Sequence, residues 1–275
     1  MKSSNIIKRM AIGEALKQQK KILESQGYTV AYIALYGSQN YSLDVMTDEY
    51  QSDIDIKAIV VPSLDDLIEN SKPVSKVVDT EWGQCDVKDI RSYFQTLLKA
   101  NPAYLETLFT DYYIVDDKFV SEFSEINARK DDLVFALRAQ MIRAMYGMMC
   151  EKEKALKHPY PSIAHKIEKF GYDGKQASHV LRLYMLMYDY YINSLPLKEA
   201  LVPQEDTDLM MALKLNKIPL EEAELIVKEL MEKGKKLRDY VLEGIDEVRI
   251  DYSIKDKFLK LSQEIIKYGV ISKYE

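Results

Sequence analysis

The sequence predicts an α+β fold in which a mixed β-sheet flanked by helices is followed by an all-α helical domain. Short apolar runs bounded by turn residues, the pattern of buried strands, occur only in the first part of the chain. From about Asp116 onward these runs disappear, and apolar residues recur at helical spacing instead. We therefore expect two domains, residues 1–120 and residues 121–275, with the boundary where the pattern changes.

The first part of the chain alternates predicted helices and strands. Apolar residues at helical spacing predict a helix from Ile6 to about Gln26, and Gly27 ends it. Asp89 occupies an N-cap position ahead of a helix over 90–100, which Asn101-Pro102 interrupts. Short helices are expected over 64–70 and 103–109. Strands are expected over 28–36, 54–61, 74–78 and 84–88, the last two around a turn near Trp82-Gly83.

The second part of the chain shows helical spacing only. Asp131-Asp132 begins a long predicted helix whose methionine stripe, Met141, Met145, Met148 and Met149, is expected in the core. Further helices are expected over 175–192, 209–215, 220–242 and 254–268.

Composition is that of a globular protein that works outside the membrane. The chain has 275 residues, of which 47% are hydrophobic and 30% charged. It shows neither an apolar run of membrane-spanning length nor a signal-peptide core, so we expect a cytoplasmic protein. Cys85 and Cys150 alone cannot form a disulfide framework. The net charge of -6 disfavours broad, non-specific binding of nucleic acid.

Two motifs predict a site for a metal-bound nucleoside triphosphate. Asp53 and Asp55 lie two residues apart at the start of a predicted strand, so both side chains point to one face. Carboxylates so close repel each other unless a cation lies between them, and oxygen ligands suit Mg²⁺. At the end of the preceding strand, Gly37 lets the backbone approach a phosphate, and Ser38 can hydrogen-bond to it.

The motifs resemble those of the nucleotidyltransferase superfamily related to DNA polymerase β. Gly37-Ser38-Gln39-Asn40-Tyr41 followed by Ser52-Asp53-Ile54-Asp55 is most similar to a branch of predicted nucleotidyltransferases of bacteria and phages. The resemblance extends to Asn101–Glu106 and Gly171–His179, and so covers most of the chain. It implies a nucleotidyltransferase-type sheet, a triphosphate substrate such as ATP, and Mg²⁺ or Mn²⁺ as the metal.

The same resemblance implies a third carboxylate on a neighbouring strand, which completes the metal site and helps to deprotonate the acceptor hydroxyl. Asp86 is our candidate for this ligand. Asp89 is the rival, but it has a structural explanation as a helix cap. The two cannot face the same way in a regular strand.

Three residues near the motifs keep two interpretations each. Asn40 either touches the nucleotide or forms a local Asx turn. Lys57 follows Asp55 by two residues and either binds a phosphate or balances the aspartates. Glu106 takes part either in the site or in helix packing.

A basic row on a later helix is a further candidate for nucleotide binding. Lys175, His179 and Arg182 fall at positions i, i+4 and i+7, which places them on one stripe of a helix. The row either clamps phosphates of the nucleotide or of a nucleic-acid acceptor, or forms a solvated basic face.

These observations together predict a Mg²⁺-dependent nucleotidyltransferase. It would move a nucleoside monophosphate from a triphosphate to an acceptor hydroxyl and release pyrophosphate. The acceptor can be an RNA end, a protein or a small molecule, and the sequence does not choose among them. The alternatives are a nucleotide-binding regulator that has lost turnover and the toxin of a toxin–antitoxin pair. Neither the preferred base nor the oligomeric state follows from the sequence.

Overall fold

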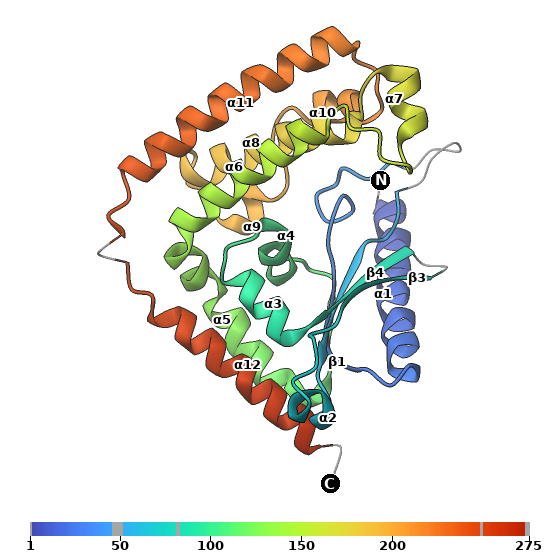
Figure 1. Cartoon of the computed structure of the whole chain (residues 1–275), viewed down its shortest axis with the longest axis vertical. Coiled ribbons are helices and arrows are strands. Elements are labelled where there is room, and N and C mark those ends of the chain that lie inside the picture. Colours follow the sequence, from blue (N-terminus) through green and yellow to red (C-terminus); the bar gives the residue numbers. More distant parts are fainter. Residues whose placement is uncertain (1, 46–51, 81–82, 248–249, 273–275) are drawn as a thin grey trace. The chain divides into compact units, whose positions relative to one another are not determined.

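The computed structural model describes residues 2–45, 52–80, 83–247 and 250–272 (Figure 1). The chain folds into two compact units. The sheet unit comprises Met1–Leu137 and Asp251–Glu275, and the helical unit comprises Arg138–Ile250. The boundary that we predicted near residue 120 lies inside the sheet unit, and the division into domains at that point stays a prediction.

The sheet unit contains the mixed sheet that the sequence predicted. Its five strands lie in the order β3-β4-β2-β1-β5. Strands β2 and β4 are parallel, and the other neighbouring pairs are antiparallel. The strands are β1 (Thr29–Leu35), β2 (Ile56–Val61), β3 (Ser75–Thr80), β4 (Gly83–Asp89) and β5 (Tyr113–Val115). The predicted turn residue Trp82 lies outside the described residues.

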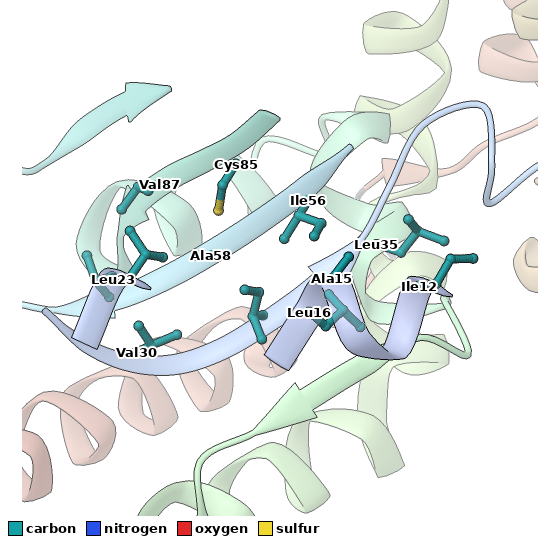
Figure 2. Packing of buried hydrophobic residues seen from close by; sticks show 12 residues of the cluster. Ile12, Ala15, Leu16, Leu23, Val30, Leu35, Ile56, Ala58, Cys85 and Val87 are labelled. Carbon is teal, nitrogen blue, oxygen red and sulfur yellow. The ribbon is translucent and has the colours of Figure 1, made fainter. Parts of the chain in front are cut away.

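Helices cover both faces of this sheet. The helices of the unit are α1 (Lys2–Ser25), α2 (Leu64–Ile68), α3 (Ile90–Leu97), α4 (Pro102–Leu105), α5 (Val120–Ala136) and α12 (Ser253–Ile271), with 3-10 turns η1 (Glu106–Leu108) and η2 (Asp117–Phe119). Apolar side chains of α1, among them Leu16 and Leu23, pack against alternate residues of the strands (Figure 2).

The face opposite α1 is covered by α3 and α12. Both helices contact β2. The rings of Phe94 and Phe258 lie 6.5 Å apart between the two helices. A Cβ placed on Gly269 of α12 would lie only 2.7 Å from Val61 Cγ1, so the glycine allows close packing of helix on strand. Because strand side chains alternate, Lys57, Ile59 and Val61 point to this second face.

The central strands carry the site at their ends. All residues of β1 except Thr29, and all of β2, are buried, as expected for continuous apolar runs in a covered sheet. Leu35 pairs with Ile56, and the amide of Tyr36 donates a hydrogen bond to the Asp55 carbonyl at 3.0 Å. The end of β1 therefore meets the start of β2 at one edge of the sheet.

The helical unit is built around α8 (Gly174–Tyr191), which packs against α6, α10 and α11. Most of its side chains are buried all round, as expected for a central helix. The predicted methionine core is confirmed for Met141, Met145 and Met149 of α6. The surrounding helices are α6 (Arg138–Ala155), α7 (Ala164–Phe170), α9 (Leu197–Ala200), α10 (Thr207–Lys214) and α11 (Leu220–Glu243). In the described part of the chain, no helix is both long and apolar enough to span a membrane.

Candidate functional site

The glycine turn after β1 lies directly against Asp55. Gly37 has a φ of 83°, a left-handed conformation that a side chain makes costly. A Cβ placed on Gly37 would lie 2.7 Å from Oδ2 of Asp55, closer than real Cβ contacts allow. The backbone conformation therefore favours glycine at this position, and a side chain here would also have to displace the Asp55 carboxylate. The structure thus brings Gly37 of the Gly-Ser motif into contact with Asp55, the second aspartate of the Asp-x-Asp motif.

Glu106 holds this turn from a third segment of the chain. Its Oε1 accepts a hydrogen bond of 2.7 Å from the Gly37 amide, and its side chain is only 2% exposed. Asn101 caps the preceding short helix, α4, through a hydrogen bond from the Ala103 amide. The Asn-Pro motif thus delivers a buried carboxylate to the glycine turn, which favours the site interpretation of Glu106.

The remainder of the turn is closed by backbone hydrogen bonds. The Asn40 amide donates to the Gly37 carbonyl at 2.9 Å, and the Leu43 amide donates to the Ser38 carbonyl at 3.0 Å. Ser38 and Asn40 are both partly exposed. Gln39, which the sequence did not single out, is buried and donates from Nε2 to the Ser52 carbonyl at 3.1 Å. Gln39 therefore ties the turn to the segment that leads into Asp53.

The two aspartates of the second motif precede β2 rather than opening it. Asp53 is exposed and Asp55 is partly buried, whereas the strand begins at Ile56. We expected a strand over 54–61 with both aspartates at its start, and the strand instead begins two residues later, at Ile56. Their roles as metal ligands stay predictions.

These carboxylates fit a metal that arrives with a triphosphate. Mg²⁺ in such sites is held by one or two carboxylates, and phosphate oxygens and water supply the other ligands. Asp55 provides oxygen donors directly against the Gly37 turn, and the exposed Asp53 lies two residues earlier in the chain. Among the described residues, no group of three or more His, Cys, Asp and Glu side chains is placed to hold a metal ion. Asp53 and Asp55 would therefore hold the ion together with the substrate.

Asp86 is engaged by two lysines on the same face of the sheet. Lys57 lies opposite Asp86 in the parallel register, and its ammonium pairs with Oδ2. The Lys88 ammonium lies 3.0 Å from Oδ1. Lys57 therefore neutralises Asp86 in this structure, an arrangement that the sequence did not indicate. The role of Asp86 as the third metal ligand stays a proposal.

Two tyrosine rings complete the surroundings of Lys57. The ammonium nitrogen lies 4.4 Å from the ring centre of Tyr36 and 4.6 Å from that of Tyr104, within the range of cation–π attraction. The Lys57 side chain is 3% exposed, and this burial lowers the pKa of Lys57, an effect that Asp86 opposes.

Three carboxylates act on the hydroxyl of the buried Tyr36. Burial first, and then the charges of Asp55, Asp86 and Glu106, raise the pKa of Tyr36. Burial and Asp86 raise the pKa of the Cys85 thiol to about 12. Both groups are therefore neutral near pH 7.

Asp89 has the capping role that the sequence indicated. Its Oδ1 accepts a hydrogen bond of 2.8 Å from the Arg91 amide at the start of α3. Oδ2 lies 2.7 Å from Nη2 of Arg91, and Asp89 is 1% exposed. The Asp89 carboxylate caps the start of α3, whereas the Asp86 side chain lies on the same face of the sheet as Lys57. This division supports Asp86 over Asp89 as the candidate.

The basic row of Lys175, His179 and Arg182 lies in the helical unit, on α8. Lys175 is exposed, His179 is partly buried and Arg182 is 8% exposed. The row is thus solvated only at Lys175, because neighbouring helices cover α8 along most of its length. Its role in nucleotide binding stays a proposal.

No protein-family model matches the chain, and no curated protein matches it. One solved structure that is similar is the nucleotidyltransferase-like protein from Exiguobacterium sibiricum 255-15. It is 13% identical, the match covers 94% of this chain and 91% of that chain, and the TM-score is 0.35.

Proposed function

We propose that the protein is a Mg²⁺-dependent nucleotidyltransferase that moves a nucleoside monophosphate from a triphosphate to an acceptor hydroxyl. The contact between the Gly37 turn and Asp55 carries this proposal. The Gly37 backbone lies against the Asp55 carboxylate, and a metal-bound triphosphate would relieve repulsion between this carboxylate and that of Asp53, two residues earlier.

The turn would hold the triphosphate. Gly37 and Ser38 would contact phosphate oxygens, and the partly exposed Asn40 is placed to touch the nucleotide. Glu106 fixes the Gly37 amide, so it would set the geometry of the turn. Bound with the substrate at Asp53 and Asp55, Mg²⁺ would neutralise charge that develops on the phosphate oxygens.

In the transfer step, the acceptor oxygen would form a bond to the α-phosphorus while the bond to the pyrophosphate oxygen breaks. Pyrophosphate leaves with the electron pair, and the hydroxyl proton passes to Asp86. To accept it, Asp86 has to exchange at least one of its lysine partners. Lys57, once released, would bind the negative charge of the phosphates. Lys175, His179 and Arg182, on α8, are proposed to bind a phosphate group within the helical unit.

Label transfer tests this function. The protein is incubated with each α-³²P-labelled nucleoside triphosphate, with Mg²⁺ or Mn²⁺, and with total cellular RNA and protein. We expect label on an RNA or protein band with the wild type and none with Asp53→Ala/Asp55→Ala. Asp65→Ala, which removes an exposed carboxylate of the same unit, is the matched control and should transfer label like the wild type.

A second candidate is nucleotide binding without transfer. It is favoured by one observation, the engagement of both oxygens of Asp86 by Lys57 and Lys88. Triphosphate binding that depends on Asp53 and Asp55, with no transfer to RNA, protein or small-molecule hydroxyl acceptors such as aminoglycosides, would favour this candidate over the enzyme.

A further inference from the structure

Three helix ends meet at one junction within the helical unit. The Asp173 amide, just ahead of α8, donates to the carbonyl of Leu156 at the end of α6 at 2.8 Å. A Cβ placed on Gly174 would overlap the Leu213 carbonyl oxygen of α10. Asn216, just after α10, donates from Nδ2 to the Tyr172 carbonyl at 3.0 Å. The ends of α6 and α10 are thus fastened to the start of α8.

Cationic side chains gather at this junction from all three helices. Lys152 lies in the last turn of α6, Lys214 ends α10, and Lys175 and Arg182 lie on α8. Burial, and then the charges of these four residues, lower the pKa of His179 far below its usual value. The charges of all four residues therefore act on the same imidazole.

Lys152 and Lys175 are not balanced by nearby carboxylates. Burial lowers the pKa of Lys152, and Lys175 and Arg182 lower it further. Glu151 and Asp173 act in the opposite direction but do not cancel the effect. In the described part of the chain, no ion pair joins Lys152 or Lys175 to a carboxylate.

Helix ends explain only part of this arrangement. A lysine in the last turn of a helix is stabilised by the helix dipole, which accounts for Lys152 and Lys214. It does not account for Lys175 and Arg182, which lie in the first half of α8, where a positive charge gains nothing from the dipole. Like charges held together at a cost to the folded state are typical of a site that binds an anion.

We propose that the junction of α6, α8 and α10 binds a phosphate group through Lys152, Lys175 and Arg182, with His179 as a neutral hydrogen-bonding group. The phosphate belongs either to the polyphosphate tail of a nucleotide or to an RNA backbone. The site adds Lys152 to the basic row that the sequence indicated. It rests on the helical unit alone, so it can hold or fail independently of the transfer reaction.

Titration calorimetry tests the site with two probes, tripolyphosphate and a single-stranded RNA oligonucleotide. Both are measured in buffer with EDTA, so that the metal-dependent site proposed in the sheet unit does not contribute. Lys152→Gln and Lys175→Gln are each expected to weaken binding by about 10-fold, because each removes a charged hydrogen bond to phosphate. Lys154→Gln, an exposed lysine of the same helix, is the matched control and should bind like the wild type.

The two probes separate the sources of the phosphate. Binding of tripolyphosphate alone would assign the site to a nucleotide, and binding of RNA alone would assign it to an acceptor backbone. Wild-type protein that binds neither probe would overturn the proposal. An equal loss of probe affinity in Lys154→Gln would also overturn the proposal, because it would show that any positive charge on this helix contributes to binding.

Stability in the absence of phosphate gives a second readout. Because Lys152 is repelled by its neighbours, Lys152→Gln should have a Tm equal to or above that of the wild type. A lower Tm together with unchanged probe binding would show that Lys152 has a structural role and would overturn its place in the site. Lys175 is exposed, so Lys175→Gln tests binding even if the first variant folds poorly.

Discussion

The Lys57 ammonium and the Asp86 carboxylate face each other across the parallel strands β2 and β4 and form an ion pair almost closed to solvent. The side chain of Lys57 is 3% exposed and that of Asp86 is 15% exposed. Because Asp86 also pairs with Lys88, one carboxylate is shared by two cations. A ligand that brings negative charge to this face would compete with Asp86 for both lysines.

Removing Lys57 should destabilise the protein more than removing Lys88. Lys57→Met is expected to lower the free energy of unfolding by about 1–3 kcal/mol, since it leaves Asp86 with one partner in a largely buried setting. Lys88→Met should cost less, because Lys88 is 17% exposed and water can replace it. Urea denaturation measures both. In Lys57→Met/Asp86→Leu, much of the loss should be recovered, and a further loss would show that the pair does not act as a unit.

The Gly37 turn should not tolerate alanine. Gly37→Ala is expected to cost about 2–4 kcal/mol, because the positive φ and the overlap with Asp55 add together. Gly27→Ala is the matched control, since Gly27 has a φ of 90° but nothing lies within 4 Å of its Cβ position. Gly27→Ala should lower the free energy of unfolding only by the cost of the positive φ, about 1 kcal/mol. Equal losses in urea denaturation would contradict the close contact of Gly37 and Asp55.

Asparagine substitutions separate the roles of Asp86 and Asp89. In Asp86→Asn, we expect transfer to fall by orders of magnitude at an equal folded fraction. In Asp89→Asn, we expect a stability loss of about 1–2 kcal/mol, because the cap and the Arg91 pair weaken. Turnover of the folded Asp89→Asn protein should stay near that of the wild type. The reverse pattern would make Asp89 the catalytic carboxylate.

Acidification should destabilise the protein through His179. Its pKa in the folded state is far below the value in the unfolded chain, so the unfolded chain binds the proton more readily. The stability contributed by neutral His179 is present above the unfolded pKa, about 6.5, and is lost as the pH falls toward the folded value. Burial is the main cause of this shift, and the charges of Arg182, Lys152, Lys175 and Lys214 add to it.

The measurement is urea denaturation between about pH 7 and about pH 5. His179→Gln should lose less stability over this range than the wild type. The same substitution at the exposed His165 is the control. If His179→Gln and the wild type lose the same amount, the imidazole is not held among these cations.

Local patterns in the sequence predicted the sheet well. The apolar runs that became β1 and β2 are long enough to identify, and both are buried as such runs require. The strand β5 (Tyr113–Val115) was missed because three residues give too short a pattern to separate from a loop. Asp89 was identified correctly as a cap, because capping depends on its own position in the chain.

Long-range contacts of the site did not follow from the sequence. Glu106 reaches Gly37 from a segment 69 residues away, and Lys57 reaches Asp86 only through the parallel pairing of their strands. The spacing of Lys175, His179 and Arg182 indicated one helix stripe but not its burial, since burial depends on α6 and α10. Local periodicity is therefore sufficient to predict helices and strands, but it does not predict which side chains come into contact across the fold.

Metal-dependent nucleotide binding tests the central claim most directly. Calorimetry with ATP, GTP, CTP and UTP in Mg²⁺ and in EDTA compares the wild type with Asp53→Ala/Asp55→Ala. We predict that the wild type binds at least one triphosphate in the sheet-unit site only when Mg²⁺ is present, and that the folded double variant loses this Mg²⁺-dependent binding. Binding that is the same with and without Mg²⁺ and in both proteins, or no binding of any triphosphate by the wild type, would contradict the account.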